Sequence, residues 1–197
     1  MSDLEELNIE KYTSQNPLLR WAIKKFYSDL YSLIVNLRVK KMLDVGCGEG
    51  FVTNFVKNAN KSIRIDGLDV DRKKIMYAKK RFSQINFKVG SVYSIPKPDS
   101  SYDLVVATEV LEHLSDPPRA IKEMKRVSSK YLLFSVPRQP HFRIASILRL
   151  RYLERWGEHP EHLHSWTRNE LESFLSKFVK VRKIKNSTFW VLALCEK

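Results

Sequence analysis

The chain has 197 residues, which predicts a single domain spanning residues 1–197, and its 43% hydrophobic and 29% charged residues exclude a disordered or fibrous protein. No apolar stretch approaches the roughly 18 residues of a membrane span, and the acidic N-terminus lacks the apolar core of a signal peptide, so we expect a soluble, cytoplasmic protein. The 35 basic and 22 acidic residues give a net charge of +13, which favours anionic partners such as nucleic acid, an anionic membrane face or a phosphorylated small molecule, and which a lysine-rich proteome would also produce.

The first part of the chain alternates helices and strands. Apolar residues recur at helical spacing from Pro17 to Leu37 and predict a helix there, within an N-terminal helical extension over residues 1–37 that begins with a loosely held leader. The elements expected after it are a buried strand at Val39–Val45, a helix continuing over Asn54–Asn58, a strand at Ser62–Val70, a helix at Asp71–Phe82 with Asp71 as N-cap, and a strand at Asn86–Val89.

The second part continues this alternation and ends in a hairpin. Prolines near the first turn mark a helix start at Ser115–Pro118, and Thr167 and Glu170 have the spacing of a capping box. The expected elements are a fourth strand at Tyr102–Ala107, the helix after Ser115–Pro118, a fifth strand at Tyr131–Val136, a helix at Thr167–Phe178, and hairpin strands at Val179–Ile184 and Phe189–Cys195 around Lys185–Thr188.

Strands that alternate with helices predict an α/β fold with a parallel sheet, into which the terminal hairpin inserts an antiparallel strand. Two distant cysteines, Cys47 and Cys195, exclude a disulfide scaffold and a zinc finger and fit a reducing compartment. Ligands of such sheets bind at the carboxyl ends of the strands. The irregular segment 138–166 follows the fifth strand and is therefore expected to be a lid or substrate-side insertion.

Residues 138–156 of this insertion hold five arginines and one glutamate among large apolar residues, so as a helix they would have an apolar and a basic face. Two interpretations are open. The helix packs on the core over the active site, or it is a lid whose basic face contacts an anionic substrate, a membrane or RNA. Its aromatic residues do not form a stacking platform, which argues against an RNA-binding module without catalysis.

The segment Met42–Gly50, MLDVGCGEG, runs from an apolar strand into alternating glycines, which permit a tight turn and a close approach of backbone to a ligand. Asp69 ends the next strand, where a carboxylate can accept hydrogen bonds from both hydroxyls of a ribose. A pyrophosphate is disfavoured, because Phe51 stands where a dinucleotide site needs a small residue and because Asp44 and Glu49 bring negative charge. The loop and its acidic residues therefore suit a nucleoside that carries an amino group and a positive charge, and S-adenosylmethionine has these features.

Three motifs, LDVGCGEG at 43–50, GLDVD at 67–71 and SSYDLVVATEVLEHLSDP at 100–117, resemble the class I S-adenosylmethionine-dependent methyltransferases. The similarity covers about residues 38–137 and is closest to the type 11 branch, which includes ubiquinone and menaquinone biosynthesis enzymes. It implies a three-layer, Rossmann-like α/β fold with a seven-stranded, mostly parallel sheet and a C-terminal antiparallel hairpin strand. It also implies an enzyme that transfers a methyl group from S-adenosylmethionine to oxygen or carbon of a small-molecule or lipid-like acceptor and releases S-adenosylhomocysteine.

The resemblance assigns cofactor contacts to individual residues. Asp44 would orient the amino group of the methionyl part, and Asp69 would accept the ribose hydroxyls. Ser91 stands where the family usually offers an aspartate to the adenine, so the backbone at Val92 would carry more of that recognition. The other implied contacts are Gly46, Cys47 and Gly48 along the methionyl part, Val70 against the adenine, and Thr108 and Glu109 beside the sulfonium and the substrate.

Methyl transfer to an amine or hydroxyl needs a base, and the histidines lie on the substrate side. All of them fall on or after the exit of the fourth strand: His113, His141, His159, His162 and His164. We expect Glu112, His113 and His162 to be catalytic in a pocket without a metal ion, with Val110 and Leu111 packed inward beside them.

Two other functions remain open. A metal-dependent RNA 2′-O-methyltransferase, similar to the small-RNA 3′-end methyltransferases, would align Glu109, Glu112 and His113 at positions i, i+3 and i+4 of a helical turn. His162, or His164 in its place, would complete a site for Mg²⁺, Mn²⁺ or Co²⁺. An inactive, cofactor-binding scaffold is the third function, and the intact glycine loop argues against it.

Overall fold

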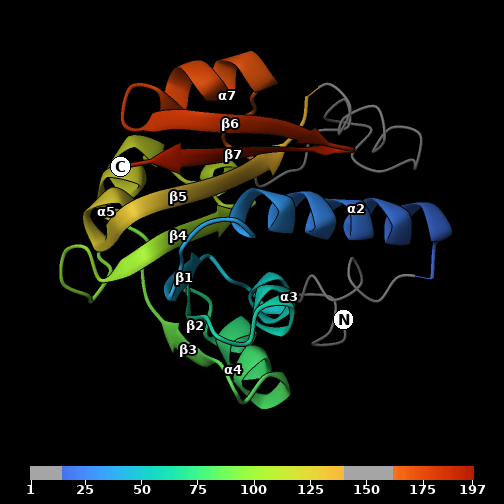
Figure 1. Cartoon of the computed structure of the whole chain (residues 1–197), viewed down its shortest axis with the longest axis vertical. Coiled ribbons are helices and arrows are strands. Elements are labelled where there is room, and N and C mark those ends of the chain that lie inside the picture. Colours follow the sequence, from blue (N-terminus) through green and yellow to red (C-terminus); the bar gives the residue numbers. More distant parts are fainter. Residues whose placement is uncertain (1–14, 140–161) are drawn as a thin grey trace.

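The computed structural model describes residues 15–139 and 162–197, whose strands form one sheet in the order β3-β2-β1-β4-β5-β7-β6 (Figure 1). Neighbouring strands are parallel as far as β5, and β7 runs antiparallel to both β5 and β6. The predicted seven-stranded α/β fold with an inserted antiparallel strand is therefore confirmed. The strands are β1 (Lys41–Val45), β2 (Arg64–Asp69), β3 (Asn86–Val89), β4 (Tyr102–Thr108), β5 (Ser128–Pro137), β6 (Lys180–Ser187) and β7 (Trp190–Glu196).

Alternate side chains of the central strands pack against two helical layers. Met42 and Leu104 pack with α2 and α3, whereas Leu43 and Val105 pack with α5 and α7. Because both faces are covered, β1 and β4 are nearly continuous apolar runs in the sequence. The helices are α2 (Pro17–Ile34), α3 (Phe51–Ala59), α4 (Arg72–Arg81), α5 (Pro117–Val127) and α7 (Arg168–Leu175), with a 3₁₀ helix at Leu111–His113.

Helix starts follow the capping signals of the sequence. The Asp71 carboxylate accepts hydrogen bonds from two backbone N–H groups in the first turn of α4. Thr167 and Glu170 form both halves of a capping box at the start of α7, and Asp116 caps α5. Each cap satisfies N–H groups that a helix start leaves without intrahelical partners.

Several boundaries differ from the prediction by up to three residues; α2 and α7, for example, end three residues early, at Ile34 and Leu175. Two strands are longer than predicted. Strand β5 begins at Ser128, three residues before the predicted Tyr131, and β6 continues through residues 185–187, which the sequence assigned to the turn. These residues are polar, but they pair with β7 through their backbone, so the turn is reduced to residues 188–189. Backbone pairing at a strand end leaves no side-chain pattern to predict it from.

Helix α2 is part of the helical layer that covers one face of the sheet. The ring of its Phe26 lies 5.0 Å from that of Trp190 in β7. Its Asp29, which is 3% exposed, pairs with Lys25 at 2.6 Å and with Lys185 of β6 at 2.7 Å. Burial alone would raise the pKa of Asp29, but hydrogen bonds from these lysines lower it overall, so the carboxylate stays charged. Residues 1–14 of the predicted extension lie outside the described residues.

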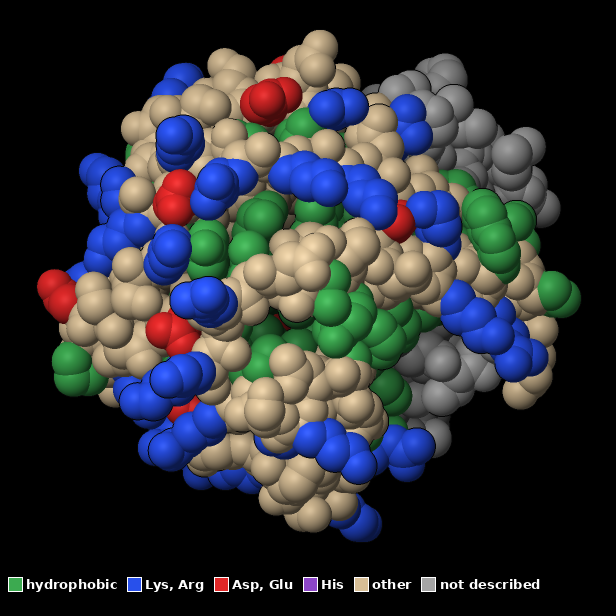
Figure 2. Space-filling model, in the orientation of Figure 1, with side chains coloured by type: hydrophobic (Ala, Val, Ile, Leu, Met, Phe, Trp, Pro, Cys, Tyr) green, Lys and Arg blue, Asp and Glu red, His purple; other side chains and the backbone are tan. Residues whose placement is uncertain are grey.

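Lys and Arg side chains are spread over the face shown in Figure 2 and do not gather in one patch. On β6, the edge strand, Lys180, Arg182 and Lys183 are exposed. Charged side chains on an edge strand hinder its pairing with another chain, which gives this part of the basic surface a structural role. Within the described residues, no helix has the length and hydropathy needed to cross a bilayer.

Tyr102→Phe is expected to lower the free energy of unfolding by about 1.5–3 kcal/mol at pH 7. The Tyr102 hydroxyl donates to Asp66 Oδ2 at 2.6 Å, and Asp66 is 7% exposed. Burial raises the pKa of Asp66, but hydrogen bonds from Tyr102 and Asn86 and the charge of Lys97 lower it overall. The penalty is therefore complete above about pH 4 and shrinks as the pH falls through the lowered pKa. Urea unfolding across this range measures it, and equal stability of variant and wild type at pH 7 would contradict the assignment.

Candidate active site

The loop between β1 and α3 folds back over the end of β2. Its glycines, Gly46, Gly48 and Gly50, have φ angles of 69°, 52° and 81°, in the left-handed region that residues with side chains disfavour. The backbone N–H groups of Gly46 and Cys47 both donate to the Leu68 carbonyl oxygen, at 2.7 and 3.1 Å. The protein itself therefore fixes the shape of the loop.

The space around the three glycines differs, and it distinguishes two glycines that pack against side chains from one that faces open space. A Cβ at Gly46 would overlap the Val110 side chain, and one at Gly50 would come within 2.7 Å of the Phe87 ring. A Cβ at Gly48 would meet nothing within 4 Å. Gly48 therefore presents bare backbone to open space, as a loop does when a ligand lies along it.

Asp69 ends β2 and connects the glycine loop to the start of α4. Its Oδ2 accepts from the Gly48 N–H and its Oδ1 from the Asp71 N–H, both at 2.8 Å. A carboxylate has about four acceptor positions, so Asp69 retains capacity for the two hydroxyls of a ribose. The next residue, Val70, is 75% exposed and offers an apolar surface for a planar base. The predicted ribose and adenine contacts thus adjoin at the end of β2.

Asp44 and Cys47 are buried beneath the loop. The Thr53 hydroxyl donates to Asp44 Oδ2 at 2.6 Å, while Oδ1 has no hydrogen-bond partner among the described residues. Burial raises the pKa of Asp44 to about 7, the charge of Asp69 adds to this, and the Thr53 hydrogen bond opposes it. Burial also raises the pKa of the Cys47 thiol, which therefore stays protonated and packs as an apolar side chain. The predicted contact of Asp44 with an amino group stays a prediction.

The loop after β3 lies beside Asp69, because the Gly90 N–H donates to the Asp69 carbonyl oxygen at 2.9 Å. Ser91 and Val92 of this loop are half-buried. Ser91 Oγ accepts a hydrogen bond from the Tyr93 N–H at 3.2 Å and closes a local turn. One acceptor position of Ser91 is thus used within the loop, and the adenine contacts of Ser91 and Val92 stay predictions.

The chain leaves β4 differently from the prediction. Thr108, which is 9% exposed, ends the strand, and the Glu109 N–H still donates to the β5 backbone at 3.0 Å. Glu109 then adopts a φ of 58°, and the 3₁₀ helix begins at Leu111. The predicted helical turn that aligns Glu109 with Glu112 and His113 is therefore wrong, because strand pairing and a left-handed turn hold Glu109 outside the helix.

Glu112, His113 and His162 meet just after β4. One metal-ligating atom from each lies within 4.8 Å of the others, and the two imidazole rings are 5.0 Å apart at 70°. Glu112 is 1% exposed, whereas both imidazoles are partly exposed. Val110 and Leu111 pack inward beside them, as predicted. The structure thus brings together the three residues that the sequence predicts to be catalytic, and their chemical role stays a prediction.

His162 reaches this cluster because the chain beside it is hydrogen-bonded to the 3₁₀ helix. The backbone N–H groups of Leu163 and His164 both donate to the Glu112 carbonyl oxygen, at 2.8 and 3.1 Å. His164 Nε2 lies 3.0 Å from the Leu114 carbonyl oxygen. That ring is therefore engaged outside the cluster and does not take the place of His162.

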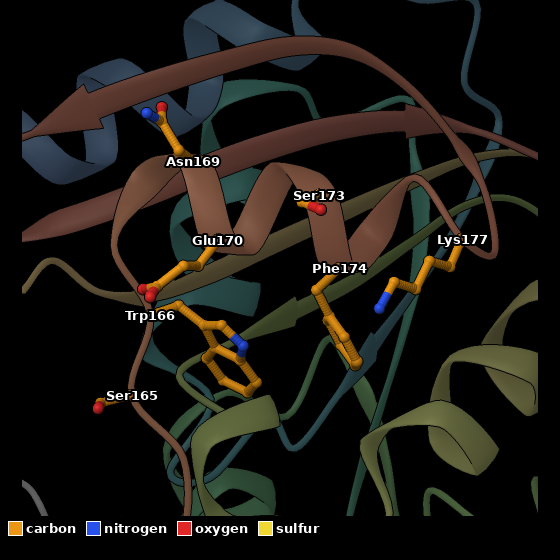
Figure 3. Close-up of a pocket in the computed structure, with 7 residues that line it drawn as sticks. All are labelled: Ser165, Trp166, Asn169, Glu170, Ser173, Phe174 and Lys177. Carbon is orange, nitrogen blue, oxygen red and sulfur yellow. The ribbon is translucent and has the colours of Figure 1, made fainter.

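An aromatic ladder packs this segment against α7. Successive ring centroids lie 5.4, 5.6 and 5.5 Å apart, and each such pair contributes about 0.5–1.5 kcal/mol. The ladder consists of His164, Trp166, Phe174 and Phe178. Figure 3 shows Trp166 and Phe174 beneath α7, where they line an open hollow. This ladder was not predicted from the sequence, in which its one signal is the i, i+4 spacing of its two phenylalanines. The hollow is lined only by residues between 165 and 177, so it contains none of the predicted site residues.

The middle of the predicted insertion, residues 140–161, lies outside the described residues, and with it His141, His159 and nearly all of the basic segment 138–156. The ends of the insertion are paired, since Arg138 and Trp166 form a β-bridge. The insertion therefore leaves and rejoins the fold at neighbouring points beyond β5.

Comparisons with known proteins agree with this geometry. Residues 43–131 match the family model described as a methyltransferase domain. The chain is similar to a probable S-adenosylmethionine-dependent methyltransferase of Mycolicibacterium smegmatis, with 33% identity over 88 residues, or 45% of this chain and 34% of the relative. It is also similar to the demethylmenaquinone methyltransferase of Thermotoga maritima, with 30% identity over 119 residues, or 60% of this chain and 52% of the relative. The chain thus spans about a third to a half of the length of these relatives.

Among solved structures, the crystal structure of magnesium protoporphyrin IX methyltransferase from Synechocystis PCC 6803 with bound S-adenosylhomocysteine is similar in fold. The TM-score is 0.71 at 13% identity, and the match covers 92% of this chain and 88% of that chain. Residues 43–131 thus resemble a methyltransferase domain in sequence, and the described residues share the fold of a solved methyltransferase. These similarities support the predicted class I methyltransferase family, an enzyme and S-adenosylmethionine as its cofactor.

The residues of this methyltransferase domain fit S-adenosylmethionine. The open space at Gly48, the Asp69 carboxylate and the exposed Val70 suit the methionyl, ribose and adenine parts in chain order. The buried acids Asp44 and Glu49, 0% and 4% exposed, make the loop a favourable surrounding for the ammonium and sulfonium charges.

Gly48→Ala is expected to weaken S-adenosylhomocysteine binding at least tenfold (about 1.4 kcal/mol), because the added Cβ fills space on the ligand side of the loop. Its φ of 52° also makes the variant less stable by roughly 1–2 kcal/mol. Gly46→Ala is the matched control, since its Cβ meets Val110 and its main effect is a larger loss of stability. Calorimetry and urea unfolding separate the two effects. Undiminished affinity of Gly48→Ala would remove Gly48 from the site.

Asp44→Asn is expected to abolish a pH dependence of stability. The pKa of Asp44 is about 7 in the folded protein and near 4 when unfolded, so the folded state binds more protons between these values. The wild-type free energy of unfolding therefore falls as the pH rises from 4 to 7, by a total on the order of 4 kcal/mol from this group. Urea unfolding of both ligand-free proteins at pH 5 and pH 8 measures the difference. Parallel pH profiles would contradict the assignment.

Proposed function

We propose that this chain transfers the methyl group of S-adenosylmethionine to a small-molecule or lipid-like acceptor. The observation that carries the proposal is that a cofactor-type glycine loop and the Glu112–His113–His162 cluster adjoin at one edge of the sheet. Strands β1 and β4 are parallel neighbours, with Asp44 paired to Val106, so the segments that follow them leave the same edge. Val110, two residues before Glu112, packs directly on Gly46.

Methyl transfer from a sulfonium is an in-line displacement, in which the bound cofactor supplies the electrophilic methyl group. The protein has to align the acceptor, exclude water and receive a proton. Alignment contributes roughly 7–11 kcal/mol in a well-ordered site. An imidazole of His113 or His162 is suited to accept the proton of a hydroxyl, and the buried Glu112 carboxylate stabilises the resulting positive charge.

The acceptor class rests on two observations. Demethylmenaquinone methyltransferase, a relative at 30% identity, is named for a quinone acceptor, which supports a lipid-like molecule methylated at carbon or oxygen. The net charge of +13 favours acceptors that carry negative charge. Neither of the two relatives described above is named for RNA 2′-O-methylation or as an inactive scaffold. A cytoplasmic location completes the proposal, consistent with two free, buried cysteines.

Transfer of a labelled methyl group from S-adenosylmethionine to quinone precursors, lipids and RNA tests the proposal. We expect label in a quinone-like or lipid acceptor and none in RNA. Calorimetry with S-adenosylhomocysteine on the same preparation reports cofactor binding independently. Failure to bind S-adenosylhomocysteine overturns the cofactor assignment. Binding without transfer to any acceptor, or with transfer to RNA alone, overturns the acceptor class.

Asp69→Ala is expected to weaken S-adenosylhomocysteine binding by about 1.5–3 kcal/mol, because it removes hydrogen bonds to a charged acceptor. The matched control is Asp103→Ala. Asp103 also accepts from two backbone N–H groups, those of Lys40 and Lys41 at 2.7 and 2.9 Å, but at the opposite edge of the sheet. The control should lose stability and keep its affinity. Equal affinities of both variants would remove Asp69 from the binding site.

A further inference from the structure

We propose that the start of helix α2 docks on the surface of an anionic lipid bilayer. The docking surface consists of Leu18, Arg20, Trp21 and Lys24. Docking itself needs no methyl transfer. Its use, which is to bring the site to a lipid-like acceptor, rests on the proposed function.

The start of α2 projects past the edge of the sheet at which the parallel strands end. The ring of Phe26 lies 5.0 Å from that of Trp190, and Trp190 is paired with Pro137, the last residue of β5. Leu18 and Trp21 precede Phe26 by eight and five residues, which places them about 8–12 Å further along the helix axis. In Figure 1 the first turns of α2 extend past the ends of β5 and β6.

Two large apolar side chains of the docking surface face solvent. Leu18 is 62% exposed and Trp21 is 55% exposed. They are three residues apart on one helix, so they are neighbours and form a single patch. The buried residues of this part of α2, Ala22 and Ile23, contribute to the core instead. Single apolar side chains are ordinary on a protein surface, whereas tryptophan beside leucine on a basic helix is typical of a membrane-interface anchor.

The charges of α2 complement an anionic surface. Arg20 and Lys24 are exposed and lie one turn apart beside the apolar patch. The one acidic residue of α2, Asp29, is buried and paired with two lysines. The helix has no basic residue in its last turn, where its dipole would favour one. Stabilisation of the helix therefore does not account for these basic side chains, whereas attraction to anionic headgroups does.

A bilayer suits both kinds of side chain, and nucleic acid suits only one. A leucine has no planar face on which a base could stack, and nucleic acid offers no apolar boundary that would remove it from water. At a bilayer the basic groups meet the headgroup phosphates, while leucine and tryptophan are buried between the headgroups and the acyl chains. An anionic bilayer therefore accommodates all four side chains together.

Docking in this orientation turns the site toward the bilayer. Strands β1 and β4 are parallel and end at the edge past which α2 projects, and the glycine loop and Glu112 follow these strands. A lipid-like acceptor then reaches the site without passing through water, where its apolar part is unfavourable. The bilayer is thereby the source of the acceptor.

Co-sedimentation of the protein with phosphatidylglycerol vesicles and with phosphatidylcholine vesicles tests the docking surface. We expect binding to the anionic vesicles that weakens as salt is added, and little binding to the zwitterionic ones. Trp21→Ser should weaken binding to the anionic vesicles at least about tenfold, because a large apolar side chain is lost from the boundary. Val35→Ser is the matched control, because Val35 is 48% exposed at the other end of the same helix, and it should bind as the wild type does.

The combined change of Arg20→Gln and Lys24→Gln tests the charges. It should weaken binding to phosphatidylglycerol vesicles roughly 25-fold, at about fivefold for each basic side chain near the surface. The matched control is Lys180→Gln with Lys183→Gln, which removes the same charge from exposed positions of β6. This control should weaken binding much less than the α2 variant, because its residues lie away from the docking surface.

Unchanged S-adenosylhomocysteine binding by all four variants checks their folding. Absence of binding of the wild type to anionic vesicles, or equal vesicle affinity of Trp21→Ser and Val35→Ser, overturns the docking surface. Binding of RNA in place of vesicles overturns it as well. So does a dimer that sedimentation velocity detects in the wild type and not in Trp21→Ser, because the apolar patch would then join two copies of the chain.

The docking surface and the proposed function fail in different ways. A protein that binds anionic vesicles but transfers no methyl group to lipids or quinone precursors refutes the proposed function and leaves the docking surface standing. A protein that methylates a quinone precursor in solution and does not bind vesicles refutes the docking surface alone.

Discussion

The hydrogen bond from the Gly48 N–H to the Asp69 carboxylate joins the two strand ends on which the cofactor side of the site is built. The same carboxylate accepts from the Asp71 N–H, so β2, the glycine loop and α4 share one charged group. Three glycines of the loop have positive φ angles, and hydrogen bonds such as these help to set its shape. Because Asp69 is fixed from two sides, the carboxylate predicted to accept the ribose hydroxyls is in position before a ligand arrives, and little ordering remains to oppose binding.

The arrangement of the glycine loop and Asp69 could be predicted from the sequence because the residues that produce it are close together in the chain. The glycines, Asp69 and the capping residue Asp71 lie within 26 residues on consecutive elements. Parallel pairing of β1 with β2 then brings them together without any further information. Capping residues fixed the helix starts for the same reason, since each acts within a single turn.

For the cluster of Glu112, His113 and His162, the sequence predicted which residues take part but not how the chain brings them together. Glu112 and His113 are 49 residues or more from His162 in the chain, and backbone hydrogen bonds to the Glu112 carbonyl oxygen bring them together. Backbone pairing of this kind leaves no trace in side-chain identity. The helical turn expected at Glu109 failed for a related reason, because its N–H is taken by β5 and local spacing does not record tertiary pairing. The aromatic ladder was not predicted because its rings do not share one helix: two precede α7 and two lie on or after it.

Acidic residues gather at the glycine loop of a basic chain. Asp44, Glu49 and Asp69 gather acidic groups at the glycine loop of a chain whose net charge is +13. The ammonium and sulfonium groups of S-adenosylmethionine would be attracted to these acidic groups. The segment after β4 touches this loop through Val110 on Gly46, a packing contact without charge.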